Sequence, residues 1–438
     1  MSLVRALALA AFAAVGALAA AEAGQRLTLT DYDPMAVCLD GTPGAAFLVR
    51  APAGSRHPNT YVIYFEGGGW CDNVESCEAR SKMYYGTSSM EPPVMNATAP
   101  NGFTGILSRN CSVNPLWCDV NVLLLHYCDG FSFMGSLVAP IVAPSGAHLY
   151  IRGSYIRKAA LKGLLANTDA AATATEVLLA GCSAGGLSTF LHSSSVHAWV
   201  RASLPKVTKM KAAPVSGFFL ARGNADGEPV YPTKLMRMFH TANASADADP
   251  ACLAAQGPAN AARCIFAETV YATQATVPTF VLNSQIDMWQ QWCILLGSMK
   301  QGSGPYAPFY TECNDIPRLA GCTQVNWDGH PWVTGNCTAA QLAPLLGYQA
   351  SFLARVADVA GFHRAGNGAY ITSCFTHCEA ESPLWHTAVV NGATMEQAVR
   401  RWWAVDAAAP APALAHTYLD CTRTQADGTN PCNPTCPN

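Results

Sequence analysis

The chain has 438 residues, of which 50% are hydrophobic and 13% charged, so it has ample apolar material for a large core. This composition excludes a disordered chain. The formal net charge is −3 and no block of Lys or Arg occurs, which excludes the electrostatic pattern of a nucleic-acid-binding protein. Chains of this length in α/β enzymes are often built around one sheet with long loops, so we expect a single catalytic domain over residues 24–438.

Residues 1–23 have the features of a secretory signal peptide. Arg5 supplies a positive charge, residues 6–21 form an apolar run, and residues 21–23 (Ala-Glu-Ala) fit a small-x-small cleavage site. The run is shorter than the ~20 residues that span a bilayer, which favours cleavage before Gly24 over an uncleaved anchor. We therefore expect a secreted protein, extracellular or in a cell wall, without stable membrane association.

Eighteen cysteines follow this segment, and in an oxidising compartment such a set forms disulfides rather than a store of thiols. The sequence leaves their pairing open. Four Asn-x-Ser/Thr triplets are candidate glycosylation sites, which fits the same secretory route. They begin at Asn96, Asn110, Asn243 and Asn336.

Short buried strands and amphipathic helices alternate along the chain. Apolar runs that are rich in β-branched and aromatic residues predict strands at 60–65, 120–127, 176–180, 279–284 and 369–372. Apolar residues at helical spacing predict helices at 152–165, 187–200 and 341–360. Strand, helix, strand is the order of a parallel crossover, so we predict an α/β-hydrolase-like fold, a mostly parallel sheet flanked by helices.

Two stretches, residues 224–278 and 302–338, carry many Gly, Pro, Asn and Cys and little periodicity. We interpret them as long disulfide-tied insertions that form the walls of the site rather than as separate domains. The Ala/Pro run at 407–413 is predicted to be a surface connector.

The clearest chemical signal is the G-x-S-x-G motif at residues 181–186 (Gly-Cys-Ser-Ala-Gly-Gly). A predicted strand before it and a predicted helix after it are the context of a nucleophile elbow, which makes Ser183 the candidate nucleophile. The alternative is a glycine-rich turn with an incidental serine. Because the elbow backbone is tight, we expect Cys182 to stay unpaired, since a bridge there would add strain.

His377 is the candidate general base, because it lies just after the last predicted strand, where loops meet the catalytic edge. The flanking Cys374 and Cys378 can anchor its loop through disulfides to other segments. A Cys-x3-Cys pair beside a histidine also fits zinc, but secretion favours disulfides. His363 and His386 are alternatives in less clear strand-to-loop settings.

Asp287 is the candidate acid that orients the base. It lies beyond the predicted strand at 279–284 and between Ser183 and His377 in sequence, which is the chain order of α/β-hydrolases. Asp328 is the runner-up, but no strand precedes it. A competing interpretation makes Asp287 the N-cap of the helix that follows.

Residues 67–70 (Gly-Gly-Gly-Trp) end the first predicted strand and resemble the glycine-rich loop that stabilises an oxyanion in esterases. Glycines let the backbone approach a reacting carbonyl, and a second N–H group is expected from Ala184. The alternative is an ordinary glycine turn. Trp70, Trp289 and Trp292 are candidate substrate-lining residues, although such rings more often simply pack.

In combination, these segments resemble the plant pectin acetylesterase family, to which the animal carboxylesterase Notum is related. The resembling segments are residues 64–71 (YFEGGGWC), 127–130 (YCDG), 152–154 (RGS), 181–187 (GCSAGGL), 287–290 (DMWQ) and 372–378 (TSCFTHC). The catalytic triad that the resemblance implies is Ser183, Asp287 and His377. The oxyanion hole that it implies consists of backbone groups of Gly68, Gly69 and Ala184. It also implies an acyl-enzyme mechanism with no metal and no organic cofactor.

The resulting hypothesis is a serine carboxylesterase that removes O-acetyl groups from pectin or a related cell-wall polysaccharide. We expect a monomer whose partner is the acetylated polysaccharide and not nucleic acid. The first alternative is a Notum-like deacylase of a lipid-modified protein. A non-catalytic secreted binding protein on the same fold and a serine peptidase are further alternatives.

Overall fold

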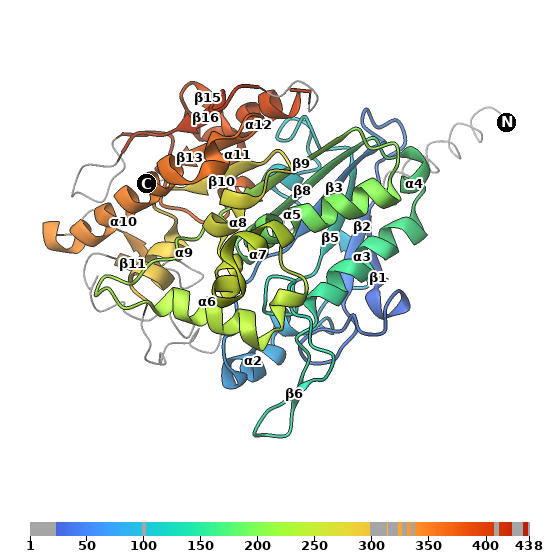
Figure 1. Ribbon diagram of the computed structural model, residues 1–438. Helices are drawn as coiled ribbons and strands as arrows, with labels where there is room; N and C mark the ends of the chain where they lie inside the picture. Colours follow the sequence, from blue (N-terminus) through green and yellow to red (C-terminus); the bar gives the residue numbers. More distant parts are fainter. Residues whose placement is uncertain are drawn as a thin grey trace.

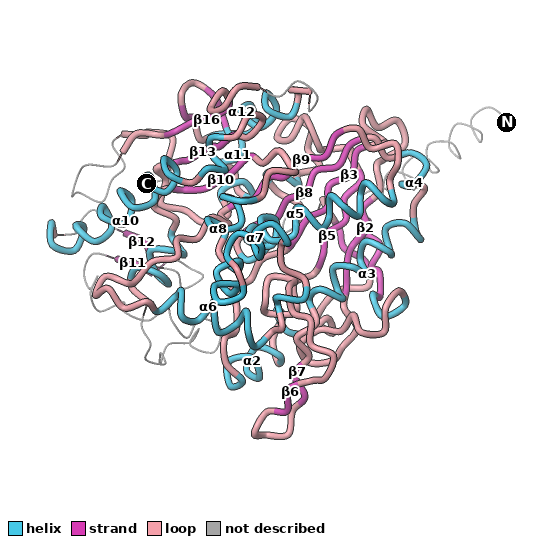
Figure 2. The backbone as a smooth tube through the Cα atoms, in the orientation of Figure 1, coloured by secondary structure: helices cyan, strands magenta, loops and turns pink. Residues whose placement is uncertain are grey.

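The computed structural model describes residues 23–98, 102–297, 313, 323–325, 331–333, 338–406, 411–422 and 432–436. A ten-stranded sheet forms its centre (Figures 1 and 2). In spatial order its strands are β16 (His416–Leu419), β13 (Gly368–Thr372), β10 (Phe280–Ser284), β9 (Lys209–Val215), β8 (Glu176–Cys182), β3 (Thr60–Phe65), β5 (Asn121–Leu125), β2 (Ala45–Val49), β1 (Ala23–Thr28) and β4 (Val94–Asn96).

The sheet is parallel from β16 through to β5. β2, β1 and β4 extend it beyond β5 in antiparallel pairs. Within the described residues, three separate two-stranded ladders lie outside it. They are β6 (Ile141–Val142) with β7 (His148–Leu149), β11 (Thr323–Val325) with β12 (Pro331–Val333), and β14 (Val389–Val390) with β15 (Ala393–Thr394). The predicted mostly parallel sheet is therefore confirmed.

Eleven α-helices occur within the described residues. They are α2 (Val74–Ser81), α3 (Gly153–Asn167), α4 (Ala170–Thr173), α5 (Ala184–Ser203), α6 (Val230–Thr241), α7 (Pro250–Gln256), α8 (Ala267–Thr273), α9 (Met288–Gln290), α10 (Ala339–Asp358), α11 (Leu384–Thr387) and α12 (Met395–Trp403). In this part of the chain no helix combines the length and apolarity needed to cross a membrane.

Alternate residues of the central strands face two separate apolar layers. On β3, Ile63 and Phe65 pack in the layer that contains α3 and α5, which lie across one face of the sheet in Figure 1. Val62 and Tyr64 pack in the opposite layer with the tryptophans of α11 and α12. This period of two in a strand buried on both faces explains why residues 60–65 read as a continuous apolar run.

Every predicted strand and helix occurs in the structure, with boundary shifts of a few residues. In the central sheet, the strands that were not predicted are β1, β2, β4, β9 and β16. β9 was missed because it carries two lysines and a proline. The ammonium of Lys211 is nevertheless buried, and it donates hydrogen bonds to the carbonyl oxygens of Trp402 (2.7 Å) and Val405 (2.9 Å). A lysine in a short segment normally indicates that the segment is exposed. Here carbonyl groups from a distant part of the chain accept hydrogen bonds from the ammonium, so the strand can be buried.

Residues 224–278 show little periodicity in sequence, but in the structure this stretch contains α6, α7 and α8. Asp249 caps α7 by accepting a hydrogen bond from the Cys252 N–H group (2.9 Å), and Pro250 starts the helix. The predicted disulfide tie is present between Cys252 and Cys264. Most of the second insertion, 302–338, and residues 407–410 of the Ala/Pro run lie outside the described residues.

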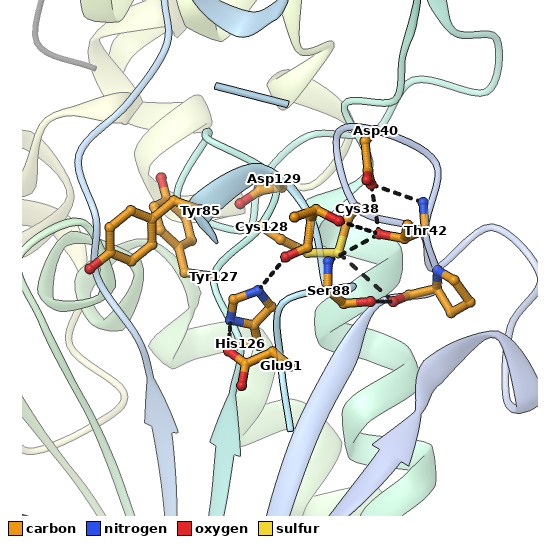
Figure 3. Close-up of a disulfide and its surroundings, with 12 residues drawn as sticks. Cys38, Asp40, Thr42, Tyr85, Ser88, Glu91, His126, Tyr127, Cys128 and Asp129 are labelled. Atoms are coloured by element: carbon orange, nitrogen blue, oxygen red, sulfur yellow. Dashed lines mark hydrogen bonds and ion pairs between the residues drawn. A yellow bond between two sulfur atoms is a disulfide. The ribbon is translucent and has the colours of Figure 1, made fainter. Parts of the chain in front are cut away.

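Eight disulfides join cysteines of the described residues, and none of these cysteines is free. The pairs are Cys38–Cys128, Cys71–Cys77, Cys111–Cys118, Cys182–Cys378, Cys252–Cys264, Cys293–Cys313, Cys374–Cys436 and Cys421–Cys432. The bond between Cys38 and Cys128, shown in Figure 3, ties the segment before β2 to the chain just after β5. A disulfide-stabilised protein is thus confirmed.

The expectation that Cys182 stays unpaired is wrong, because Cys182 is bonded to Cys378. Cys182 is the last residue of β8 and still pairs in register with Val215 of β9. The unusual backbone of the turn begins only at Ser183, so the strand geometry at Cys182 accommodates a disulfide.

Candidate active site

Ser183 occupies a sharp turn between β8 and α5, with φ 60° and ψ −124°. Its N–H group donates a hydrogen bond to the carbonyl oxygen of Val215 on the neighbouring strand (3.0 Å). A non-glycine residue at positive φ is held there only by its surroundings, and such strain is typical of a nucleophile elbow. Ser183 lines the large cavity described below, so its side chain has access to a ligand.

The glycines after Ser183 allow α5 to start against the sheet. A Cβ atom on Gly185 would lie 2.1 Å from the carbonyl oxygen of Phe65, and one on Gly186 would lie 2.2 Å from that of Val215. Both distances are far inside van der Waals contact, so only glycine fits at either position. The G-x-S-x-G-G sequence is therefore required by the approach of the helix to β3 and β9.

Asp287 lies between β10 and α9 and uses its two carboxylate oxygens for different partners. Oδ1 accepts the N–H group of Gln290 (3.0 Å) and caps α9, whereas Oδ2 lies 2.8 Å from Nδ1 of His377. The two interpretations from the sequence, helix cap and partner of the histidine, are thus compatible. Asp287 is 1% exposed, so little water competes for this contact.

His377 lies in the loop after β13, and several bonds fix this loop beside the elbow. Cys374 is bonded to Cys436, and Cys378 is bonded to Cys182. The N–H group of Met288, next to Asp287, donates to the carbonyl oxygen of Thr376 (3.0 Å). The acid loop and the histidine loop are thus connected by backbone as well as by side chains.

The ring of His377 has one nitrogen engaged and one available. Nδ1 faces Asp287, whereas Nε2 is buried without a hydrogen-bond partner among the described residues. Burial disfavours the charged ring, but the charge and hydrogen bond of Asp287 outweigh it, with help from Glu379 and Glu381, and raise the pKa of His377 above 6.5. This arrangement suits a base that takes a proton at Nε2.

The glycine-rich loop after β3 has its carbonyl groups held by side chains. The carbonyl oxygen of Gly68 accepts a hydrogen bond from Nη2 of Arg80 (2.8 Å), and that of Gly69 accepts one from the Tyr127 hydroxyl (2.8 Å). Gly68 has φ 151° and Gly69 has φ 67°, a backbone that favours glycine. Within the described part of the chain, the N–H groups of Gly68 and Gly69 have no protein acceptor.

The same loop lies directly against the elbow. A Cβ atom on Gly67 would lie 2.3 Å from the carbonyl oxygen of Cys182 and 2.8 Å from Cβ of Ser183. Ala184 is the first residue of α5, where N–H groups have no partner within the helix. The structure therefore brings Gly68 and Ala184, two of the predicted oxyanion-hole residues, close to the turn that carries Ser183.

One cavity of about 630 Å³ opens beside these residues and is lined by Ser183, His377, Gly68 and Trp289. Its other walls come from β3, β5 and the segments around β4, with apolar and tyrosine side chains. Three glutamates also line it, namely Glu66, Glu91 and Glu381. No local signal in the sequence marks them, because they lie far apart in the chain and in no chemical motif.

The predicted tryptophans differ in their positions. Trp289 lines the cavity as expected, but Trp70 does not. Trp70 packs edge-on against Trp289 and Phe219, and its indole N–H donates to the Ser132 hydroxyl (2.7 Å). Trp70 is therefore a buried support for Trp289, because its polar atom and its ring faces already have protein partners. Trp292 is also buried and is not a lining residue of this cavity.

The alternative site residues receive no support from the geometry. His363 and His386 are exposed and line no part of this cavity. Cys374 and Cys378 are both in disulfides, so neither offers a thiolate to zinc. Asp328 lies outside the described residues.

Three of the candidate glycosylation sites are exposed, namely Asn96, Asn110 and Asn243. Asn96 lines the rim of the cavity. Asn336 lies outside the described residues.

Known proteins resemble this chain in sequence and in fold. A family model described as Pectinacetylesterase matches residues 19–437. Pectin acetylesterase 11 of Arabidopsis thaliana is 28% identical over 406 residues, which are 92% of this chain and 89% of that protein. Palmitoleoyl-protein carboxylesterase notum1′ of Xenopus laevis is 31% identical over 167 residues, which are 38% of this chain and 31% of that protein.

Among solved structures, the Wnt deacylase Notum from Drosophila superposes with a TM-score of 0.71 and 20% identity, covering 95% of this chain and 100% of that chain. At this identity the likeness concerns the fold alone. The family model, in contrast, matches nearly the whole sequence. The chain therefore has a Notum-like α/β-hydrolase fold and belongs to the pectinacetylesterase family of carboxylesterases.

Proposed function

We propose that the protein is a secreted serine carboxylesterase that removes O-acetyl groups from pectin or a related cell-wall polysaccharide. The observation that carries the proposal is the convergence of three segments on one cavity. The elbow at Ser183 and the loop of His377 both line it, and Asp287 contacts His377 from behind. This is the arrangement that a serine hydrolase requires.

In the proposed reaction, the Ser183 hydroxyl attacks the acetyl carbonyl carbon while its proton passes to Nε2 of His377. The carboxylate of Asp287 stabilises the imidazolium that forms. N–H groups of the glycine-rich loop and of Ala184 stabilise the oxyanion. The C–O bond to the sugar then breaks, and the sugar oxygen takes the proton from His377. Water repeats the sequence on the acetyl-enzyme, releasing acetate and restoring Ser183.

The walls of the cavity favour a sugar over a long lipid chain. Each buried CH₂ group contributes ~0.8 kcal/mol only where it meets apolar surface. Here Glu66 and Glu381 line the space and are partly exposed, and covering these carboxylates with hydrocarbon removes their hydration without replacing it. Sugar hydroxyls, in contrast, donate hydrogen bonds to carboxylates. The alignment supports the same choice, because the plant relative matches 92% of this chain and the notum1′ relative 38%.

Secretion is part of the proposal and is supported by the disulfides. Eight bonds among the described residues need an oxidising compartment to form and persist. The proposed signal peptide lies almost wholly outside the described residues, which begin at 23. We further propose that the protein acts as a monomer on its polysaccharide.

A series of acyl chain lengths tests the proposed function. Acetyl, butyryl, octanoyl and palmitoleoyl esters of one phenol are assayed side by side with acetylated pectin, and Ser183→Ala serves as the blank. We expect kcat/KM to be highest for acetyl or butyryl and lower for octanoyl, together with acetate release from pectin. A rate that climbs from acetyl to palmitoleoyl, without acetate release from pectin, identifies a lipid deacylase instead.

A further inference from the structure

The charge of the cavity is unbalanced. Among the described residues that line it are three glutamates and no lysine or arginine. Its volume of about 630 Å³ is in the range of sites for whole ligands, roughly 300–1,000 Å³, and is several times what a two-carbon acyl group fills. The alcohol part of the ester therefore shares this space with the carboxylates.

Glu66 and Glu91 converge on one imidazole. Nδ1 of His126 lies 2.9 Å from Glu66 Oε2 and 2.8 Å from Glu91 Oε1, while Nε2 donates to the carbonyl oxygen of Thr87 (2.9 Å). Figure 3 shows His126 between Glu91 and the segment before Ser88. Burial opposes protonation, but the two glutamates outweigh it and raise the pKa of His126 to about 10. Two carboxylates thus share one cation.

The two glutamates contact the same ring nitrogen of His126. Nδ1 carries a single N–H, and Glu66 Oε2 accepts it, with a second hydrogen bond from the Tyr127 N–H group (2.8 Å). Glu91 is 7% exposed, and its Oε1 lies 2.8 Å from the same ring nitrogen. Burial raises the pKa of Glu91, but His126 outweighs this and holds it below 4.5, so Glu91 is ionised. Two glutamates thus face one imidazolium, and the Arg26 guanidinium, which donates to the Glu91 backbone carbonyl (3.0 Å), is a further positive charge beside Glu91.

Glu381 adds a third carboxyl group on the side of the histidine loop. It follows His377 by four residues and accepts a hydrogen bond from the Tyr64 hydroxyl (2.5 Å). Burial raises the pKa of Glu381, so this group becomes charged at a higher pH than an ordinary glutamate. We call Glu66, Glu91 and Glu381 the acidic subsite. All its oxygens are hydrogen-bond acceptors when ionised, which suits hydroxyl groups and repels anions.

We propose that the acidic subsite makes the enzyme select uncharged O-acetylated sugars and discriminate against sugars that carry a free carboxylate next to the acetyl group. This inference rests on the proposed function and narrows it. In an acidic polysaccharide, the preferred substrate residues are those whose carboxyl groups are methyl-esterified. Neutral acetylated glycans belong to the same class.

The test uses two substrates that differ by one charge, an O-acetylated methyl galacturonoside as its free acid and as its methyl ester. We expect kcat/KM for the methyl ester to exceed that for the free acid by at least about threefold at low salt, the effect of one like charge at roughly 6 Å in water. The ratio should fall towards one in 1 M salt, where the Debye length is ~3 Å. Salt should leave the methyl ester rate unaffected.

Three variants test whether the preference for the methyl ester over the free acid comes from the acidic subsite. Glu91→Gln keeps the shape of the side chain and leaves one carboxylate for His126, so the ratio at low salt should fall. Glu381→Gln, which keeps an acceptor for Tyr64, serves if Glu91→Gln does not fold. Asp358→Asn removes one exposed negative charge at the end of α10, outside the cavity, and should leave the ratio unchanged.

The outcomes separate the two proposals. Equal or faster hydrolysis of the free acid at low salt overturns the charge selection and leaves the acetylesterase intact. A ratio that Asp358→Asn lowers as much as Glu91→Gln shows that overall charge, not the acidic subsite, decides. If neither sugar ester is hydrolysed while phenyl acetate is still cleaved, both proposals are overturned: the acetylesterase acting on sugars and the charge selection by the acidic subsite.

Discussion

Cys182 and Cys378 form a disulfide that joins the residue before Ser183 to the residue after His377. The two cysteines are 196 residues apart in sequence. The covalent path from the proposed nucleophile Ser183 to the proposed base His377 therefore passes through only the two bonded cysteines. It fixes the distance between two loops that no backbone hydrogen bond in the described residues joins directly.

Removal of this disulfide should reduce the rate of catalysis as well as the stability of the fold. In Cys182→Ser/Cys378→Ser we expect kcat to fall by roughly 10- to 100-fold, because a misplacement of the base by about 1 Å has an effect of this size. The kcat of the variant is measured at a temperature where its circular dichroism spectrum matches that of the wild type, so that a loss of activity does not reflect unfolding.

The matched control is Cys252→Ser/Cys264→Ser, which removes a bond between residues 12 apart in the helical insertion. Chain entropy predicts stabilisation of about 3 kcal/mol from this bond and about 5 kcal/mol from the longer one. The control should therefore lower Tm and keep kcat at the temperature where it is folded. Equal kcat in both double variants would show that the bond between Cys182 and Cys378 is only structural.

Ser183→Ala should abolish ester hydrolysis and leave the fold intact. The substitution removes one oxygen and keeps the elbow, so we expect a loss in kcat on the order of 10⁴ or more with an unchanged Tm. Steady-state assays with phenyl acetate measure it. Activity within tenfold of the wild type would remove Ser183 from the nucleophile role.

Asp287→Asn should separate the two roles of this side chain. Asparagine still caps α9 through its oxygen, so Tm should change little. Because it no longer orients the imidazole or stabilises its charge, we expect kcat to fall by about 10⁴. Asp287→Ala loses the cap as well and should cost about 1 kcal/mol more in the free energy of unfolding. A variant Asp287→Asn with nearly full kcat would exclude Asp287 as the partner of His377.

The pH profile gives a second readout of the same contact. His377 acts as a base only when neutral, and Asp287 raises its pKa above 6.5, so kcat/KM of the wild type should fall as the pH drops through that raised pKa. Without the Asp287 charge, the pKa of His377 falls, and the acid limb in the residual activity of Asp287→Asn should move to lower pH. A shift to higher pH contradicts the assignment.

Gly67→Ala should impair catalysis through the oxyanion loop. Its Cβ atom would collide with the Cys182 carbonyl oxygen and with Ser183, so the loop must move away from the elbow. Loss of an oxyanion donor lowers kcat by about 10²–10³, and we expect a decrease of this order with a smaller change in KM. Gly347→Ala is the control, since Gly347 lies in α10 with open space around it. That variant should keep its activity and gain roughly 0.5–1 kcal/mol in stability.

The sequence by itself predicted the elements whose signals are local. The run at 60–65 predicted β3 with its observed ends, and G-x-S-x-G between a strand and a helix placed Ser183 at the turn where the structure has it. Both signals arise from backbone geometry and burial over about ten consecutive residues. Asp287 and His377 were predicted as site residues because each follows a predicted strand, and parallel strands end at one edge of a sheet.

The tertiary structure alone decided which distant residues meet. It paired Cys182 with Cys378, against the sequence-based expectation, and it gathered Glu66, Glu91 and Glu381 from three separate segments around one cavity. Neither arrangement has a local signature, because a disulfide or a cluster of charges depends on distances across the fold. Hydrophobic periodicity determines which faces of each element are buried, whereas the packing of those faces determines which loops become neighbours.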